Sequence, residues 1–223
     1  MANHPLFLGH RGVRRDRSVP ENTLAAFDLA LAEGCDGFEF DVRLSEDGHA
    51  VICHNPKTRR MEIAACSAHS LRLPLLTEVL QRYRRSAFLD IELKVAGLEA
   101  ITAALLRKYS PARGFVVSSF LPECLLRLRK LDSSIPLGLI CESEDQLERW
   151  RKLPAQYVIL HHKLVQPALI EQIKSARKKI LVWTVNYAAD MKRFSRWGVD
   201  GIISDSPRKL IHALGRTDRR NAI

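Results

Sequence analysis

The order of expected strands and helices constrains the fold of this chain most strongly. Eight short apolar runs, each typical of a buried strand, alternate with eight stretches of helical periodicity. The strands are expected near residues 6–9, 37–44, 87–94, 115–119, 136–140, 156–160, 180–185 and 201–204. The helices are expected near residues 21–33, 76–85, 98–108, 122–131, 144–152, 166–177, 188–197 and 207–214. Strict alternation with nearly continuous apolar strands predicts an α/β protein with a (β/α)8 TIM barrel.

One further strand is expected outside this alternation. Asp47-Gly48 is a strong signal for a two-residue turn, and residues 50–53 would return antiparallel to residues 37–44. A turn centred on this pair places Asp41 opposite His54, with Glu39 on the same face. The pattern predicts an extra β-hairpin strand that brings two carboxylates and an imidazole together. A solvent-exposed polar face on an ordinary hairpin is the alternative.

Length, cysteine content and hydropathy fit one domain in a reducing compartment. With 223 residues, we expect a barrel domain over residues 1–215 and a polar C-terminal tail over residues 216–223. The five cysteines are odd in number and lack metal-ligand spacing, which indicates reduced thiols. No run of about 18 apolar residues is present to cross a membrane. These features predict a cytoplasmic protein.

The charge balance of the chain is strongly basic. There are 35 Lys and Arg residues against 25 Asp and Glu residues, a formal net charge of +10. Such a surface attracts phosphodiesters, anionic lipid headgroups or nucleic acid, but it does not define any chemistry. The chain has no recognisable nucleic-acid motif and no aromatic-rich basic stripe. Transient contact with an anionic membrane surface is compatible with the sequence, no nucleic-acid partner is expected, and no oligomeric state is indicated.

Ionisable side chains gather where the expected strands end. In a parallel barrel these ends meet at one face, where active sites of this fold lie. The residues on or after these strand ends include His10, Arg11, Glu39, Asp41, Asp90, Glu92, Lys94 and Trp183. Charges that point into a barrel are costly unless they are paired or bind a metal. The pattern predicts a site at this face, and an ion-pair network without catalysis is the alternative.

The ligand types in this group indicate which metal it would bind. Carboxylates are present, whereas accompanying Cys ligands and clustered His ligands are not. Hard divalent cations prefer oxygen ligands, so Mg²⁺ or Ca²⁺ is expected rather than zinc. Trp183 is a candidate for an apolar wall beside the organic part of a ligand, with core packing as the alternative.

Several ordered motifs resemble those of the glycerophosphodiester phosphodiesterase family, which has the phospholipase C-like phosphodiesterase barrel. The densest part includes HRG at residues 10–12, PENT at 20–23, GFEFDVRLSEDG at 37–48 and ICHN at 52–55. The resemblance continues with ELK at 92–94, SSF at 118–120, WTVN at 183–186 and GVDGIISDSP at 198–207. It therefore covers nearly the whole chain, and the ordered set is more specific than any single motif.

The resemblance implies an activity and a role for each matching residue. The activity is metal-dependent hydrolysis of glycerophosphodiesters, such as glycerophosphocholine and glycerophosphoethanolamine, to glycerol 3-phosphate and an alcohol. The implied roles are metal binding by Glu39, Asp41 and Glu92, phosphate binding by Arg11 and Lys94, and acid–base catalysis by His10 and His54. The sequence does not separate the acid from the base. Asn22 is assigned no chemistry and is expected to tie the first helix to the loop after His10.

The chain departs from the family pattern over residues 55–75. Relatives generally have an aspartate after the hairpin histidine and then an insertion that covers the barrel mouth, whereas this chain has Asn55 and about twenty residues in total. The reduced cap predicts a more open site. Two rivals follow. One is a lysophospholipase D that acts on lysophospholipids, and the other is a non-catalytic phosphate- or nucleic-acid-binding module.

Overall fold

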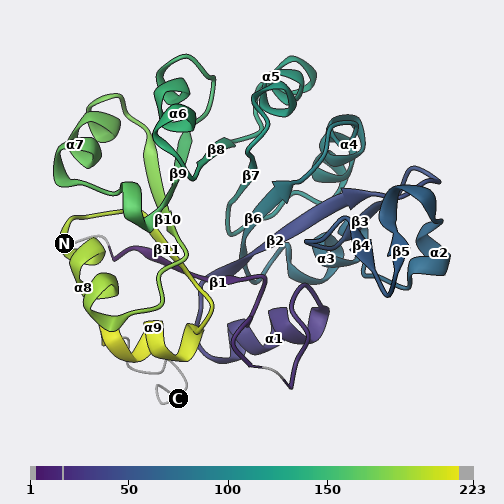
Figure 1. The fold of residues 1–223 in the computed structure, drawn as a ribbon, viewed down its shortest axis with the longest axis horizontal. Helices are drawn as coiled ribbons and strands as arrows, with labels where there is room; N and C mark the ends of the chain where they lie inside the picture. Colours follow the sequence, from purple (N-terminus) through teal and green to yellow (C-terminus); the bar gives the residue numbers. More distant parts are fainter. Residues whose placement is uncertain (1–3, 17, 216–223) are drawn as a thin grey trace.

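The computed structural model describes residues 4–16 and 18–215, and within them eight parallel strands close into a barrel (Figure 1). The ring runs in the order β1, β11, β10, β9, β8, β7, β6 and β2, and pairing of β2 with β1 closes it. The strands are β1 (Leu6–His10), β2 (Gly37–Leu44), β6 (Phe88–Leu93), β7 (Phe115–Ser119), β8 (Leu137–Cys141), β9 (Tyr157–His161), β10 (Lys179–Trp183) and β11 (Gly201–Ser204). The predicted barrel is confirmed. The predicted tail, residues 216–223, lies outside the described residues.

Helices surround the barrel between successive strands. They are α1 (Leu24–Ala32), α3 (Leu76–Tyr83), α4 (Glu99–Lys108), α5 (Pro122–Leu131), α6 (Glu144–Leu147), α7 (Pro167–Ser175), α8 (Ala188–Arg196) and α9 (Pro207–Leu214). Helix α1 begins later than predicted because Thr23 is its N-cap and accepts a hydrogen bond from the Ala26 amide at 3.2 Å. The stretch predicted as one helix over residues 144–152 is α6 followed by the 3₁₀ helix η2 (Glu148–Arg151). None of the helices in the described part of the chain is long and apolar enough to cross a membrane.

Two apolar layers lie on opposite sides of the strands. The larger layer fills the space between strands and helices, where Phe27 stacks on Phe38 with 4.3 Å between ring centroids. The smaller layer fills the barrel interior with alternate strand residues such as Leu8, Ile159 and Ile203. The interior is therefore a packed core that closes the floor beneath the carboxyl ends of the strands.

The extra hairpin strand is present, but its predicted register is wrong by one residue. Strand β3 (Ala50–Ile52) pairs antiparallel with β2, with Leu44 opposite Ala50. Asp41 therefore lies beside Cys53, whose amide donates to the Asp41 carbonyl at 3.0 Å. The cause is a loop one residue longer than the two-residue turn, in which the Ser45 amide donates to the carbonyl of His49 and Gly48 has a φ of +78°.

Residues 55–75, where the sequence predicts a reduced cap, form a short segment of small elements. This segment contains β4 (Lys57–Thr58), β5 (Met61–Glu62), the 3₁₀ helix η1 (Ile63–Ala65) and α2 (Ala68–Leu71). Ile63, Ala68 and Leu71 pack with Val51 of β3 into a small apolar cluster of their own. The cap therefore sits beside the hairpin, at one edge of the barrel (Figure 1).

Candidate active site

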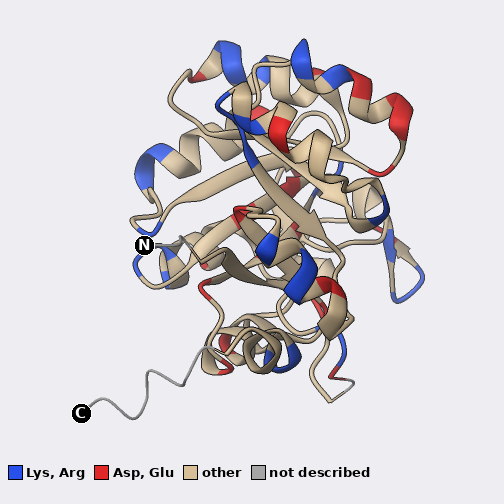
Figure 2. Ribbon diagram, turned by 90° about the vertical axis from the view of Figure 1, so that its left-hand side faces the viewer, with Lys and Arg blue, Asp and Glu red and all other residues tan. Residues whose placement is uncertain are grey.

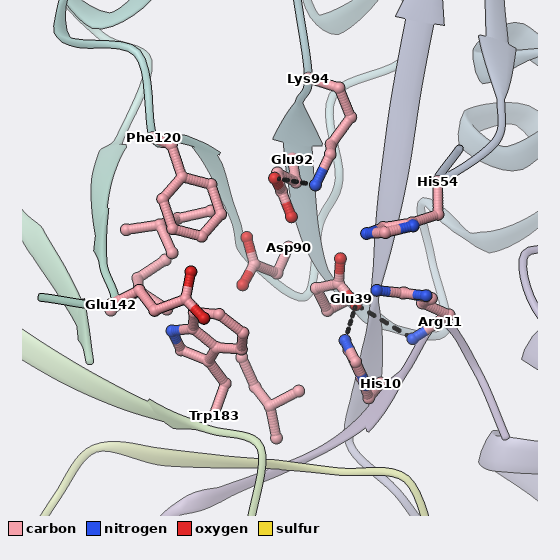
Figure 3. Close-up of a pocket in the computed structure, with 13 residues that line it drawn as sticks. His10, Arg11, Glu39, His54, Asp90, Glu92, Lys94, Phe120, Glu142 and Trp183 are labelled. Atoms are coloured by element: carbon pink, nitrogen blue, oxygen red, sulfur yellow. Dashed lines mark hydrogen bonds and ion pairs between the residues drawn. The ribbon is translucent and has the colours of Figure 1, made fainter. Parts of the chain in front are cut away.

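A pocket of about 260 Å³ lies among the carboxyl ends of the barrel strands. Figure 3 shows that its walls differ in chemistry. His10, Arg11, His54 and Lys94 form a cationic and imidazole side, and Phe120, Glu142 and Trp183 lie opposite. Glu39, Asp90 and Glu92 lie between the two sides. The pocket therefore has one wall suited to a phosphate and another suited to an organic group.

Three buried carboxylates from two neighbouring strands form the centre of the site. Glu39, Asp41 and Glu92 each offer an oxygen, and these oxygens all lie within 4.8 Å of one another. The parallel register of β2 and β6 pairs Asp41 with Glu92, which sets them at the same height. Glu39 Oε1 is buried without a hydrogen-bond partner. An uncompensated buried oxygen in an all-carboxylate cluster fits a hard divalent cation.

The pKa values within this cluster move in opposite directions. Burial, followed by the charges of Asp41 and Glu92, raises the pKa of Glu39 well above its ordinary value. Burial is also the main cause that raises the pKa of Glu92 to about 8 and that of Asp90 to about 7. Burial would raise the pKa of Asp41 too, but Lys94 and Arg11 outweigh it and lower that pKa. A cation would favour the ionised form of every carboxylate in the cluster.

Arg11 is held in place by acidic groups on three sides. Its amide donates to Glu39 Oε2 at 3.0 Å, Nη1 donates to Glu21 at 2.8 Å, and Nε lies 3.1 Å from Asp41. Its φ of +52° is unusual for a residue with a side chain. Lys94 donates to Glu92 at 2.6 Å and lies 3.4 Å from Asp41. Both cations are therefore positioned beside the carboxylates before any ligand binds.

His10 is oriented by a carboxylate that sequence reasoning missed. Its Nδ1 lies 2.6 Å from Asp205 Oδ1, and its Nε2 lies 3.8 Å from Glu39. Because a carboxylate accepts, the proton belongs on Nδ1, and Nε2 faces the pocket. Asn186 donates to Asp205 at 2.6 Å and fixes its orientation in turn. One feature of the sequence could have identified Asp205 as a site residue, because it directly follows the last expected strand of the barrel.

His54 enters the pocket from the end of the hairpin, although its predicted pairing with Asp41 is not formed. Its Nδ1 lies 2.9 Å from Asn55 Oδ1. Burial lowers the pKa of His54, while the charge of Asp41 opposes that decrease. Figure 3 shows the imidazole pointing toward the carboxylates. The two pocket histidines thus have different partners, a carboxylate for His10 and an amide for His54.

Asn22 is a second residue whose position the sequence did not reveal. It was expected only to tie helix α1 to the preceding loop. Its side-chain amide donates to Asp41 Oδ2 at 2.8 Å, and its carbonyl accepts from the Asp41 amide at 3.2 Å. Asn22 therefore orients one carboxylate of the cluster directly. Its φ of +58°, a conformation that Asn tolerates, shapes the loop that makes this contact.

Comparisons with known proteins point to one family. The chain matches the glycerophosphoryl diester phosphodiesterase family over residues 10–99 and 90–209. It is 32% identical to a glycerophosphodiester phosphodiesterase of Caldanaerobacter subterraneus subsp. tengcongensis, over 94% of this chain and 97% of the relative. A glycerophosphodiester phosphodiesterase of Bacillus altitudinis is 29% identical over 91% of this chain and 95% of its own length.

A solved structure extends the comparison. An Oleispira antarctica phosphodiesterase in complex with the product sn-glycerol-3-phosphate superimposes with a TM-score of 0.82 and 27% identity, over 95% of this chain and 97% of that one. A Thermotoga maritima glycerophosphodiester phosphodiesterase shares the fold with a TM-score of 0.81, over 94% of this chain and 98% of its own. The chain is a phosphoric diester hydrolase and belongs to the glycerophosphoryl diester phosphodiesterase family.

Proposed function

We propose that the enzyme hydrolyses glycerophosphodiesters, such as glycerophosphocholine and glycerophosphoethanolamine, to glycerol 3-phosphate and an alcohol. The observation that carries this proposal is a pocket lined by two cations and two histidines, with a cluster of three buried carboxylates beside them. The complex of the Oleispira antarctica relative with sn-glycerol-3-phosphate supports the choice of product.

We assign Glu39, Asp41 and Glu92 as the ligands of a divalent cation, Mg²⁺ or Ca²⁺. The unpartnered Glu39 Oε1 supports this assignment, as does the raised pKa of Glu92. When bound, the cation supplies charge neutralisation for the phosphodiester and its transition state. Asn22 keeps the Asp41 carboxylate oriented while this occurs.

Arg11 and Lys94 are the phosphate-binding residues in this proposal. Arg11 offers a planar fork for two phosphate oxygens, and Lys94 adds a compact positive charge on the neighbouring strand. Their contacts with Glu21 and Glu92 keep both side chains at the cationic wall. Trp183, on the opposite wall, would shield the bound organic group from water.

His10 and His54 share the acid and base roles. The attacking oxygen is either the glycerol 2-hydroxyl, which leads through a cyclic phosphate, or a water molecule. One histidine removes the proton from this oxygen, and the other donates a proton to the oxygen of the departing alcohol. Asp205 keeps His10 in the tautomer with Nε2 toward the pocket.

The reduced cap favours one second candidate, a lysophospholipase D that releases lysophosphatidic acid. In this candidate the acyl chain of a longer substrate would extend past the cap, which packs beside the hairpin through its own cluster around Ile63 and Leu71. The two candidates differ in whether the glycerol carries an acyl chain.

Release of glycerol 3-phosphate from glycerophosphocholine, with Mg²⁺ or Ca²⁺ and with EDTA as the control, tests the proposal. Release that requires the cation and stops with EDTA is expected. Activity on lysophosphatidylcholine alone would instead support the second candidate. Cation-independent release would contradict the role of the carboxylate cluster.

A further inference from the structure

A second cavity lies at the end of the barrel opposite the active site. It has a volume of about 1040 Å³ and is bounded by the first residues of several strands, among them Leu6 of β1, Tyr157 of β9 and Lys179 of β10. His10 stands at the other end of β1, and the packed interior around Leu8 lies between the two sites. A molecule in this cavity would therefore not touch a substrate bound at the active site.

The lining of this cavity has an excess of positive charge. Its described residues include one carboxylate, that of Asp200, whose Oδ2 accepts a hydrogen bond from the Ile180 amide at 2.8 Å. They also include four Lys and Arg side chains, those of Arg113, Lys174, Lys179 and Arg196. Across residues 4–16 and 18–215, none of these four cations forms an ion pair with a carboxylate. The cavity therefore attracts an anion from outside the chain.

Three of these cations are held by neutral partners rather than by acids. Lys179 Nζ lies 3.4 Å from the Tyr157 hydroxyl and 5.4 Å from the centroid of the Tyr157 ring. Lys174 donates to the carbonyl of Gly198, and Arg196 Nε donates at 3.3 Å to a backbone carbonyl of its own helix, α8. A carbonyl or hydroxyl positions a cation without cancelling its charge. These three cations are therefore both oriented and uncompensated.

The Tyr157 hydroxyl supplies a second donor beside Lys179. Tyr157 is only 6% exposed, and the centroid of its ring lies 6.4 Å from that of Phe88. Because an ammonium group has hydrogens to donate and no lone pair with which to accept, Lys179 is the donor in their contact. The hydroxyl hydrogen therefore has no acceptor within the described part of the chain. An ammonium and a hydroxyl that both need an acceptor at one place favour a ligand rich in oxygen atoms.

A phosphate monoester matches these groups better than a carboxylate does. It carries about two negative charges and three strong acceptor oxygens. It can therefore accept from Lys179 and Tyr157 together and still offer an oxygen to the planar fork of an arginine. Phe88 and Phe115 add apolar surface to the same cavity. The cavity volume lies at the upper end of the range for sites that bind small organic ligands.

We propose that this cavity is a binding site for small molecules that carry a phosphate monoester and an apolar or aromatic group. The phosphate binds between Lys179 and Tyr157, and the carbon skeleton lies against Phe88 and Phe115. The site does not depend on the reaction at the other end of the barrel, so failure of the proposed function would leave this inference in place.

Phenyl phosphate is the probe, because it contains both chemical groups and no phosphodiester bond. Backbone amide NMR spectra of the full chain, recorded with EDTA at constant ionic strength, locate its binding. Gly114 and Gly198 line the cavity, whereas Gly9 and Gly12 flank the active-site pair His10-Arg11. Saturable shifts are expected at Gly114 and Gly198. Phenol, which lacks the phosphate, should leave these amides unshifted, and benzoate should bind several-fold more weakly than phenyl phosphate.

Tyr157→Phe and Lys179→Gln should each weaken the binding of phenyl phosphate by roughly tenfold. Phenylalanine keeps the ring and its packing, and the hydroxyl has no protein partner besides Lys179 in the described chain, so the fold should be retained. Lys152→Gln is the matched control, because Lys152 is an exposed lysine that does not line the cavity. This change removes the same charge and should leave the affinity unaltered. The dispersion of the amide spectra confirms that each variant is folded.

Several results would overturn the proposal. One is the absence of saturable shifts at Gly114 and Gly198, and another is a set of shifts confined to Gly9 and Gly12, which would place the probe in the active site. Binding that Tyr157→Phe and Lys179→Gln leave unchanged, or that Lys152→Gln weakens equally, would show only general attraction to a basic surface. Benzoate binding as tight as that of phenyl phosphate would overturn the choice of a phosphate group.

Discussion

The two histidines of the site differ in the group behind them, and this difference has a measurable effect. Asp205 offers His10 a carboxylate oxygen 2.6 Å from Nδ1. Asn55 offers His54 only an amide oxygen at 2.9 Å. The pKa of His54 is lowered by burial, and its amide partner compensates less than a carboxylate would.

Replacing Asn55 with Asp should raise the pKa of His54. The new carboxylate favours the protonated imidazole, so the limb of the pH–rate profile that reports His54 should move to higher pH by about one unit. The measurement is kcat/KM for glycerophosphocholine between pH 5 and 9, with Asn55→Ala as the control. An unchanged profile in Asn55→Asp would show that His54 does not titrate in the rate-limiting step.

Asp205→Asn should lower kcat by roughly tenfold to a hundredfold with little change in KM. The isosteric amide keeps the contact with His10, but because its NH2 group also donates, it no longer fixes the tautomer with Nε2 toward the pocket. Steady-state kinetics test this expectation, and a thermal melt confirms that the fold is retained. A rise in KM with unchanged kcat would instead place Asp205 in substrate binding.

The buried carboxyl groups of Asp90 and Glu92 should make the stability of the cation-free protein depend on pH. In the folded state the pKa of Asp90 is about 7 and that of Glu92 about 8, whereas unfolded carboxyls ionise near pH 4. Between these values the folded state holds protons that the unfolded state has released, so stability falls as pH rises from about 4.5 to 8. Urea unfolding with EDTA should show this decline. Saturating Mg²⁺ or Ca²⁺ should reduce it, and a flat profile without cation would contradict it.

Residues on strand ends were predictable from the sequence, whereas their supporting partners were not. Glu39, Glu92 and Lys94 occupy alternate positions near the ends of strands. Alternate residues of a strand share a face, and the strand ends of a barrel meet at one side, so these two facts place the three residues together. Asn22 and Asp205 reach the site from loops. Their contacts with Asp41 and His10 form only because segments distant in the sequence meet in the folded chain. A local sequence pattern does not predict such contacts.

At the scale of single elements, β2 depends on a residue without a side chain. A Cβ on Gly37 would lie 1.8 Å from the carbonyl oxygen of Phe88 on the neighbouring strand. Gly37→Ala should lower the free energy of unfolding by about 3 kcal/mol, because the strands must separate to admit the methyl group. Urea unfolding measures this loss.

Gly48→Ala is the matched control for that experiment. Gly48 has a φ of +78° in the hairpin loop, and a Cβ there would meet no atom within 4 Å. Its cost is the backbone conformation alone, about 1 kcal/mol. Equal losses in the two variants would show that the close approach of β2 and β6 can relax.

The hairpin also shows that a local sequence pattern does not determine the length of a turn. An Asp-Gly pair suits a two-residue turn, and it equally suits a three-residue loop in which the glycine forms a bulge. The side chain of Ser45 favours the longer loop here by binding Asp47 at 2.6 Å and the amide of His49 at 2.9 Å. The sequence predicted the strand itself correctly, because strand formation depends on the apolar alternation rather than on the turn.

At the scale of the molecule, the barrel was predictable because its pattern repeats eight times. One misplaced helix boundary, as in α6 and η2, does not alter the order of strands. The net charge likewise belongs to the whole molecule rather than to any one element. Figure 2 shows Lys and Arg on several outer helices with Asp and Glu among them, and the sum over the chain is +10.

This net charge should make the use of anionic substrates sensitive to salt. The kcat/KM for glycerophosphoglycerol, which has a net negative charge, should fall several-fold between about 0.01 and 0.15 M ionic strength as attraction is screened. Zwitterionic glycerophosphocholine should change less, which makes it the control. An equal decrease for both substrates would point to a salt effect on the site itself.

The bond between His10 and Asp205 joins residues 195 positions apart, across the seam where β1 meets β11. His10, at the end of β1, therefore acquires its carboxylate partner only when β11 pairs with β1 and closes the ring. A chain that lacks β11 keeps Glu39, Asp41 and Glu92, but its His10 has no carboxylate partner. Full activity should therefore require the closed ring, and a variant truncated before β11 should hydrolyse phosphodiesters far more slowly than the intact chain.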